Sequence, residues 1–350
     1  MEKLEGRYKR EFFIRTTCEK REQILAFIKD NKQKIRNCYS ETCELDNHDY
    51  VMMILRDAIF VIELLLRNFE EDERDFLLVI PAEKNALRLD LQLLENQLPY
   101  FLLEGLYKLV ISSPSFMHLC FKFFEDQMFD SVPEETVFKH FTDLRRSALV
   151  KSYPKQKFEY PEIDLPCAAK LHKSGVKFKA VHKTDQCLLD IKFEVDELRI
   201  PHLKVYDETE TILRNIMAVE QCLYPDDTRV CSYIELINGL IDTKKDMNFF
   251  ADAGIISHFM VDDASVANMF NRLSLYIHTK KSSYYAIRKD LKEHYKNPSN
   301  HTKAAFILWF DDPLKSSGTF LAVFTVVLTL IQTIISIIGA ATGPACCTPC

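Results

Sequence analysis

The sequence predicts a mainly α protein: a multi-helix globular domain with a small antiparallel β element and one C-terminal transmembrane helix. Three patterns lead to this fold class. Apolar residues recur with a period near 3.6 within residues 19–150 and again from residue 208, which is typical of amphipathic helices. Within residues 176–205 the pattern alternates, as in half-buried strands. Residues 319–338 carry no charge, and a membrane-spanning helix needs about 20 such residues.

The composition disfavours several common classes of enzyme. Only 8 of the 350 residues are glycine, and no G-x-G-x-x-G, G-x-x-x-x-G-K-[ST] or G-x-S-x-G occurs. Dinucleotide dehydrogenases, P-loop NTPases and common serine hydrolases are therefore disfavoured. The net charge is −6, whereas nucleic-acid binding usually needs a basic surface, so we expect no nucleic-acid partner.

The N-terminal part reads as successive helices. Ile24, Phe27, Ile28 and Ile35 mark one apolar face. Residues 51–66 follow as the central core helix, because their three charges would be costly in lipid. Further helices are expected over residues 87–95, 99–111, 113–126 and 134–149.

Residues 151–166 contain three prolines and mixed charges, which favours a linker or a long surface loop. This is the best internal boundary. We expect residues 1–150 to form the N-terminal helical part of one domain, and residues 151–315 to form its C-terminal part.

The C-terminal part begins with the β element. Strands are expected within residues 176–181, 188–195 and 198–205, with Gly175 opening the first. Pro201 should keep the third strand at an edge, because proline cannot donate to the ladder. Helices are then expected over residues 208–223, 231–241, 246–253, 264–278 and 283–295.

The uncharged segment predicts a transmembrane helix over residues 319–341, followed by a short tail at 342–350. Lys303 and Lys315 precede it and no positive charge follows, which places the preceding residues in the cytoplasm. We therefore expect a single-pass membrane protein with a C-terminal anchor and a cytosolic bulk. The pattern does not distinguish plasma membrane from endomembrane.

Cysteine and histidine give no pattern typical of metal or catalytic sites. Eight cysteines are scattered, no H-E-x-x-H occurs, and the C-x₂-C at Cys347 and Cys350 ends the chain. We expect no enzyme activity, no catalytic residue, no metal and no cofactor. Cys346, Cys347 and Cys350 are candidate lipidation sites if the tail is cytoplasmic, or are simply tolerated there.

The most distinctive stretch places polar Glu95, Asn96 and Gln97 inside an apolar run, and Pro99, two residues after Gln97, starts the next expected helix. Buried polar groups must be hydrogen-bonded, or each costs about 1–3 kcal/mol. Two interpretations stay open: these side chains cap helix ends at the break, or they form a polar binding site at a core junction.

This stretch also carries a family resemblance. LENQLPYFLLEGLYKL resembles the LENQ-[IL]-P-[FY]-F-x-L-E signature of a plant-specific family, domain of unknown function 247. Other stretches resemble further motifs of that family, at residues 1–10, 36–40, 52–60, 168–179, 189–193, 198–202, 214–222 and 232–246.

The resemblance implies a plant membrane protein without established catalysis. Some members lie at grass self-incompatibility loci and look like recognition determinants. The expected function is therefore that of a membrane-anchored plant protein of unknown biochemical activity, which acts on an unknown protein partner in recognition or signalling. Two alternatives stay open: a hydrolase-like or other enzyme with a spatially assembled Cys/His/acid site, and a channel-associated membrane subunit.

Overall fold

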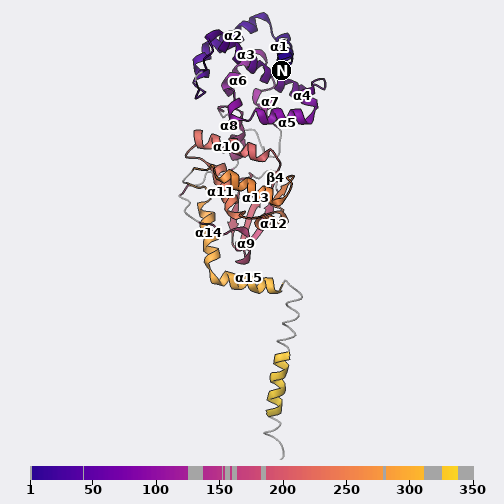
Figure 1. Cartoon of the computed structure of the whole chain (residues 1–350), viewed down its shortest axis with the longest axis vertical. Coiled ribbons are helices and arrows are strands. Elements are labelled where there is room, and N and C mark those ends of the chain that lie inside the picture. The colour runs from indigo at the N-terminus through magenta and orange to yellow at the C-terminus, as the bar shows by residue number, and fades with distance from the viewer. Residues whose placement is uncertain are drawn as a thin grey trace, which may run out of the picture.

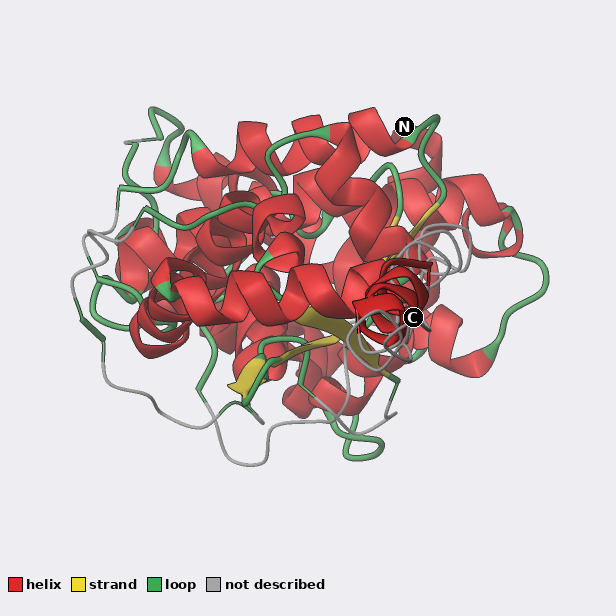
Figure 2. Cartoon of the chain, turned by 90° about the horizontal axis from the view of Figure 1, so that it is seen from below, coloured by secondary structure: helices red, strands yellow, loops and turns green. Residues whose placement is uncertain are grey.

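The computed structural model describes residues 2–41, 43–124, 137–151, 153, 158–159, 164–182, 187–278, 281–310 and 325–337. The N-terminal helices form one lobe, and the elements from α9 to α15 form a second lobe below it in the view of Figure 1. Short strands lie among many helices (Figure 2). The mainly helical prediction is confirmed for the described residues.

The N-terminal lobe is built around α3, a long helix that is buried along most of its length. Asp46 caps its first turn by accepting a hydrogen bond from the Asp49 N–H at 2.8 Å. Helices α1, α2, α6 and α7 pack against it or against each other. The elements of this lobe are α1 (Glu2–Ile14), α2 (Cys18–Arg36), α3 (Asn47–Glu70), α4 (Phe76–Val79), α5 (Pro81–Asp90), η1 (Leu94–Asn96), α6 (Tyr100–Val110) and α7 (Phe116–Phe123).

Helix α8 (Phe141–Val150) leads into the second lobe. Its helical elements are α9 (Ala168–Lys173), α10 (Thr209–Leu223), α11 (Arg229–Leu240), α12 (Lys244–Asp252), α13 (Asp263–Ser274), α14 (Tyr285–Lys296) and α15 (Pro298–Phe310). The strands are β1 (Lys177–Val181), β2 (Lys192–Glu194), β3 (Glu197–Pro201), β4 (Leu203–Val205) and β5 (Ile256–His258). Helices α1, α4, α9 and α15 and strand β5 were not predicted.

The expected strands exist, but the expected pairing is wrong in part. In the order β1-β3-β2, β2 pairs with β3 antiparallel, whereas β1 pairs with β3 parallel. The second sheet, β4-β5, is also parallel. A parallel pair needs a long crossover, so alternation within one short stretch of sequence does not specify it.

The expectation for Pro201 is also wrong, because β3 lies between its two neighbours rather than at an edge. Pro201 is the last residue of β3 and pairs with Val181. The ladder continues through His202, whose N–H donates to the Val181 carbonyl at 3.0 Å. A missing N–H is therefore tolerated at the end of this central strand.

Two hydrophobic cores meet at α8. Residues from Tyr8 to Leu144 form the first core, and residues from Leu149 to Leu291 form the second. Leu144 and Leu149 both belong to α8, so this one helix contributes to both cores. In the segment expected to be a linker, Tyr153 is buried and Glu159 pairs with Ser282 in an isolated bridge.

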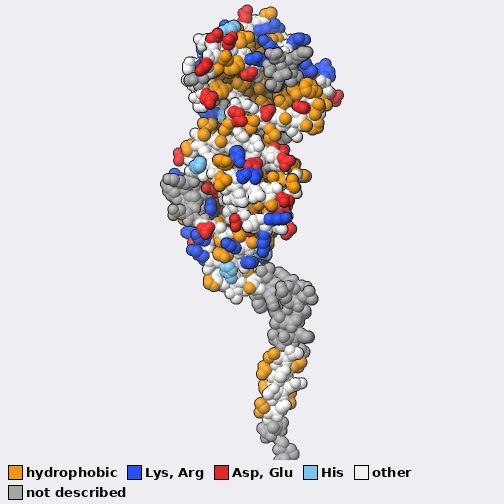
Figure 3. Space-filling model, viewed as in Figure 1, with side chains coloured by type: hydrophobic (Ala, Val, Ile, Leu, Met, Phe, Trp, Pro, Cys, Tyr) orange, Lys and Arg blue, Asp and Glu red, His pale blue; other side chains and the backbone are white. Residues whose placement is uncertain are grey.

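The prediction of a transmembrane helix at residues 319–341 is wrong. None of the helices in the described ranges combines the length and the apolar character needed to cross a membrane. Residues 325–337 are helical and carry hydrophobic but no charged side chains (Figure 3). At about 1.5 Å per residue the described residues 325–337 cover roughly 20 Å, against the ~30 Å of the hydrocarbon core. Residues 319–324 and 338–341 of the predicted span and the expected tail at 342–350 lie outside the described residues.

Candidate functional site

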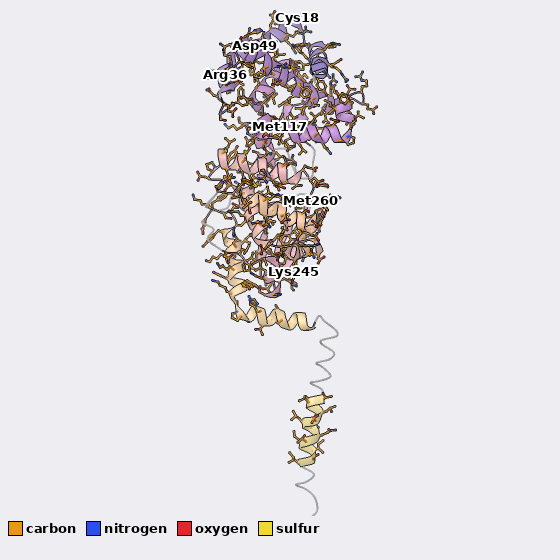
Figure 4. The ribbon with its side chains drawn as sticks, in the orientation of Figure 1. Cys18, Arg36, Asp49, Met117, Lys245 and Met260 are labelled. Carbon is orange, nitrogen blue, oxygen red and sulfur yellow. The ribbon has the colours of Figure 1, made fainter. Side chains whose placement is uncertain are left out.

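A cleft of about 1080 Å³ opens in the N-terminal lobe. Its walls come from three separate parts of the chain: the end of α2 with the loop that follows, one face of α3, and the segment from α5 through η1. Each of the three stretches that resemble family motifs, at 36–40, 52–60 and 94–104, contributes some of its residues to the cleft. Figure 4 places Arg36, at the end of α2, on the side of this lobe.

The floor of the cleft is apolar. Helix α3 presents side chains spaced three, four or seven residues apart, the spacing that places residues on one helical face. Buried Ile54 and Val61 belong to the first core, and half-buried Met53 and Phe60 pack against it. The other apolar side chains that line the cleft are Leu77, Ala86, Leu87, Leu91, Leu98 and Phe141.

The rim is acidic. Two guanidinium groups, from Arg36 and Arg56, line the cleft together with the carboxylates of Glu41, Asp57, Glu83, Asp90 and Glu95. Arg56 lies 4.0 Å from Asp57. The Arg36 guanidinium group donates to carbonyl groups of the loop after α2. The carboxylates therefore outnumber the guanidinium groups around the opening.

Arg36 fixes the loop that follows α2. It donates to the Cys43 carbonyl at 2.9 Å and to the Leu45 carbonyl at 3.2 Å. Its guanidinium carbon lies 3.8 Å from the centre of the Tyr50 ring, a cation–π contact. Tyr50 is buried, and its hydroxyl has no hydrogen-bond partner among the described residues.

Tyr39 joins this wall to the opposite one. Its hydroxyl donates to the Gln97 carbonyl at 2.9 Å. Burial raises the pKa of Tyr39, so the phenol keeps its proton and remains a donor. Residues far apart in the chain are thereby held across one end of the cleft.

Gln97 closes two helix ends with one side chain. Its amide nitrogen donates to the Leu91 carbonyl at 2.8 Å and to the Leu93 carbonyl at 2.7 Å, just after α5. Its amide oxygen accepts from the Phe141 N–H at 3.0 Å, at the first residue of α8. This buried side chain therefore satisfies groups that the helix ends leave open.

The other residues of the distinctive stretch are placed differently. Glu95 and Asn96 belong to η1, are exposed, and line the cleft. No hydrogen bond joins either side chain to another described residue. Pro99 is buried and is the N-cap residue of α6. The stretch thus combines a helix-capping residue, Gln97, with two polar groups that face the opening.

The site is tied to the second lobe through three interactions. The Leu94 N–H donates to the Asn215 side chain of α10 at 3.0 Å. Within α8, the Asp143 carboxylate accepts from the Tyr224 hydroxyl at 2.8 Å. Arg146 of α8 then pairs with Glu220 of α10 at 3.2 Å.

Glu220 is fully buried, and this desolvation raises the pKa of its carboxyl group. Arg146 and the N–H groups of Val230 and Cys231 oppose that shift. Arg146 therefore stabilises the buried Glu220 carboxylate, whose charge would be unfavourable without a partner. This ion pair lies at the contact between the two lobes.

Cysteine and histidine are not brought together around the cleft. Within the part of the chain that the structure describes, no three His, Cys, Asp or Glu side chains could hold a metal ion. Burial raises the pKa of Cys120, Cys167 and Cys231, which disfavours a reactive thiolate. Cys346, Cys347 and Cys350 lie outside the described residues.

Sequence reasoning singled out residues 95–99 but missed the other walls of the cleft. The missing members, such as Arg36, Tyr39 and Asp57, lie in stretches already noted for their family resemblance. Apolar periodicity gave no sign that these stretches meet, because it identifies the buried face of each helix separately.

Comparison with known proteins shows the family to which the chain belongs. The model of the DUF247 family, described as plant protein of unknown function, matches residues 1–328. UPF0481 protein At3g47200 of Arabidopsis thaliana is 24% identical over 342 residues, which cover 87% of this chain and 71% of that protein.

A second Arabidopsis thaliana relative, putative UPF0481 protein At3g02645, is 28% identical over 123 residues. That match covers 35% of this chain and 23% of the relative. No solved structure gives a significant match. Because the family model covers most of the sequence, the chain belongs to the DUF247 family of plant proteins of unknown function.

Proposed function

We propose that this protein acts by binding a partner protein in the cleft of the N-terminal lobe. The observation that carries the proposal is that some polar residues of the walls form hydrogen bonds within the protein, whereas others are exposed at the opening. Arg36, Tyr39 and Gln97 are engaged in holding the walls together, whereas Glu95 and Asn96 stay exposed at the opening. An apolar floor with polar groups at its edge matches the apolar core and polar rim of protein–protein interfaces.

The size of the cleft supports a macromolecular ligand. Its volume of about 1080 Å³ lies just above the ~300–1,000 Å³ typical of small-molecule pockets. Glu41 and Glu95 on its rim are exposed, which shows that the cleft is open to solvent on this side. A segment of a larger protein could therefore enter without unfolding the walls.

A photo-crosslinking pair tests this proposal. Ala86 and Asn85 are both exposed residues of α5, but Ala86 lines the cleft with Glu83 and Asp90, whereas Asn85 lies on the opposite face of the helix. A photoreactive phenylalanine at position 86 of the full chain should crosslink to a defined plant protein, whereas the same group at position 85 should not. Equal crosslinking from both positions would contradict binding in the cleft.

The identified partner then allows a quantitative test with purified proteins. Ala86→Trp fills the cleft and should weaken binding at least about tenfold, while Asn85→Trp on the opposite face of the same helix should leave affinity unchanged. Calorimetry measures both. An unchanged affinity for Ala86→Trp would place the binding surface elsewhere.

A further inference from the structure

We infer that the occupant of the cleft is an amphipathic helix with an apolar face flanked by lysine or arginine residues. The inference rests on the proposed function and specifies the chemistry of the partner segment. Three properties of the cleft lead to it: the apolar floor, the helical walls and the acidic rim.

The floor matches one face of a helix. Met53, Phe60 and Leu87 lie on two neighbouring helices, α3 and α5, and all line the cleft. Helices dock into such grooves through apolar side chains spaced i, i+3, i+4 and i+7. A guest helix with this spacing would bury its apolar stripe against the floor.

The secondary structure of the walls disfavours an occupant in extended, strand-like form. A peptide strand binds by extending a sheet edge with main-chain hydrogen bonds. In the described residues, every segment that lines the cleft is a helix, a 3-10 turn or a loop. No sheet edge is therefore available at this site, and side-chain packing must supply the contacts.

The rim specifies the charge of the guest. No ion pair joins Glu41, Glu83, Asp90 or Glu95 to a described basic side chain, and both guanidinium groups at the site are already engaged. A cationic flank would meet complementary charge there, whereas an acidic segment would be repelled. These rim charges are exposed, so their effect should decrease as ionic strength rises.

Two synthetic helical peptides test the inference on the full-length chain. They share one leucine stripe and differ only in flanks of lysine or glutamate. Fluorescence anisotropy at low salt should show the lysine peptide binding at least about tenfold tighter, with the ratio falling at high salt. Equal affinities of the two peptides would overturn the inference.

Charge-neutralising variants locate the effect. Glu83→Gln, Asp90→Asn and Glu95→Gln combined should remove most of the preference for the lysine peptide. The matched control combines Asp207→Asn, Asp252→Asn and Asp290→Asn, which changes the net charge equally on exposed acids of the other lobe. If the control reduces the preference as much, the effect comes from overall charge and the inference fails.

The cleft-filling variants separate this inference from the proposed function. Ala86→Trp should weaken binding of the lysine peptide, whereas Asn85→Trp on the opposite face of α5 should not. A peptide that binds both variants equally would occupy another surface, which overturns the inference. If a partner crosslinks at position 86 while the two peptides bind alike, the proposed function stands and only the stated chemistry of the occupant is wrong.

Discussion

At the scale of single residues, Gln97 carries the clearest structural role. Its amide contributes three hydrogen bonds that join the end of α5 to the start of α8. Gln97→Met keeps the size but leaves buried N–H and C=O groups unpaired, at about 1–3 kcal/mol for each. We expect the free energy of unfolding to fall by at least about 2 kcal/mol, as measured by chemical denaturation.

Asn96→Ala is the matched control for Gln97→Met. Asn96 is the neighbouring polar residue and is exposed, so its removal should change stability by less than about 0.5 kcal/mol. Similar losses for both variants would show that the hydrogen bonds of Gln97 do not determine stability at this break.

Asp246 should make stability depend on acid pH. Burial by itself raises the pKa of this carboxyl group, but hydrogen bonds from the N–H groups of Ala169 and Thr243 outweigh it, so the pKa is lowered overall. The stabilisation is then present above the ordinary aspartate pKa of about 3.9 and is lost as pH falls through the folded-state value.

The Asp246→Asn variant isolates this effect. It should be less stable than the wild type by about 1–3 kcal/mol near neutral pH, because its amide cannot accept the same set of bonds. The difference should shrink below about pH 4. A difference that stays constant from pH 7 to pH 3 would exclude a contribution from ionisation of Asp246.

The residues 95–97 also show how far sequence can go at this scale. A polar triplet in an apolar run indicated a special site, and the capping and binding interpretations could not be separated. The structure assigns capping to Gln97 and exposes Glu95 and Asn96. That division depends on α8, which begins far along the chain and pairs with Gln97 only in the folded state.

At the scale of elements, the contact between α2 and α6 depends on Gly105. A Cβ atom at this position would clash with the edge of the Phe27 ring. Gly105→Ala gains about 1 kcal/mol of helix propensity but overpacks a contact, which typically costs about 1–3 kcal/mol. We expect net destabilisation, measured by the midpoint of thermal unfolding.

A second substitution checks the cause. Phe27→Leu shortens the side chain opposite Gly105, so the double variant should be more stable than the two single changes predict together. Simple additivity of the two changes would mean that the α2–α6 contact adjusts in some other way.

Elements with strong local patterns were predictable, and pairings across the chain were not. The helix expected over residues 51–66 is the core of α3, since its periodicity is local. The partner of β1 is β3, not β2, because that choice depends on contacts made after the intervening chain has folded. The lack of charge in residues 319–338 predicts a membrane-spanning helix, but among the described residues no helix is long and apolar enough to cross a membrane.

At the scale of the whole molecule, the buried Arg146–Glu220 pair joins the lobes. Arg146→Met would leave the Glu220 carboxylate buried without its ion pair, a change that typically costs about 3–5 kcal/mol. Arg272→Met is the control, because Arg272 is half-exposed in its pair with Glu210, and such pairs contribute only about 0–1 kcal/mol. Equal losses in denaturant unfolding would contradict the role given to burial.

The cleft itself belongs to this largest scale. Each of its walls could be recognised as a helix or a loop from sequence, but their meeting could not. Arg36, Asp57 and Glu95 come together only because α2, α3 and the segment from α5 through η1 surround one core. A single sequence contains no direct record of such proximity.

Because α8 contributes to both cores, it determines where the chain can be divided into two recombinant fragments. The chain changes core within α8, between Leu144 and Leu149. A recombinant N-terminal half that stops before α8 would lose the Phe141 N–H that Gln97 needs, and a C-terminal half that starts after it would lose Arg146. Fragment complementation should therefore work best when both halves encode residues 137–151.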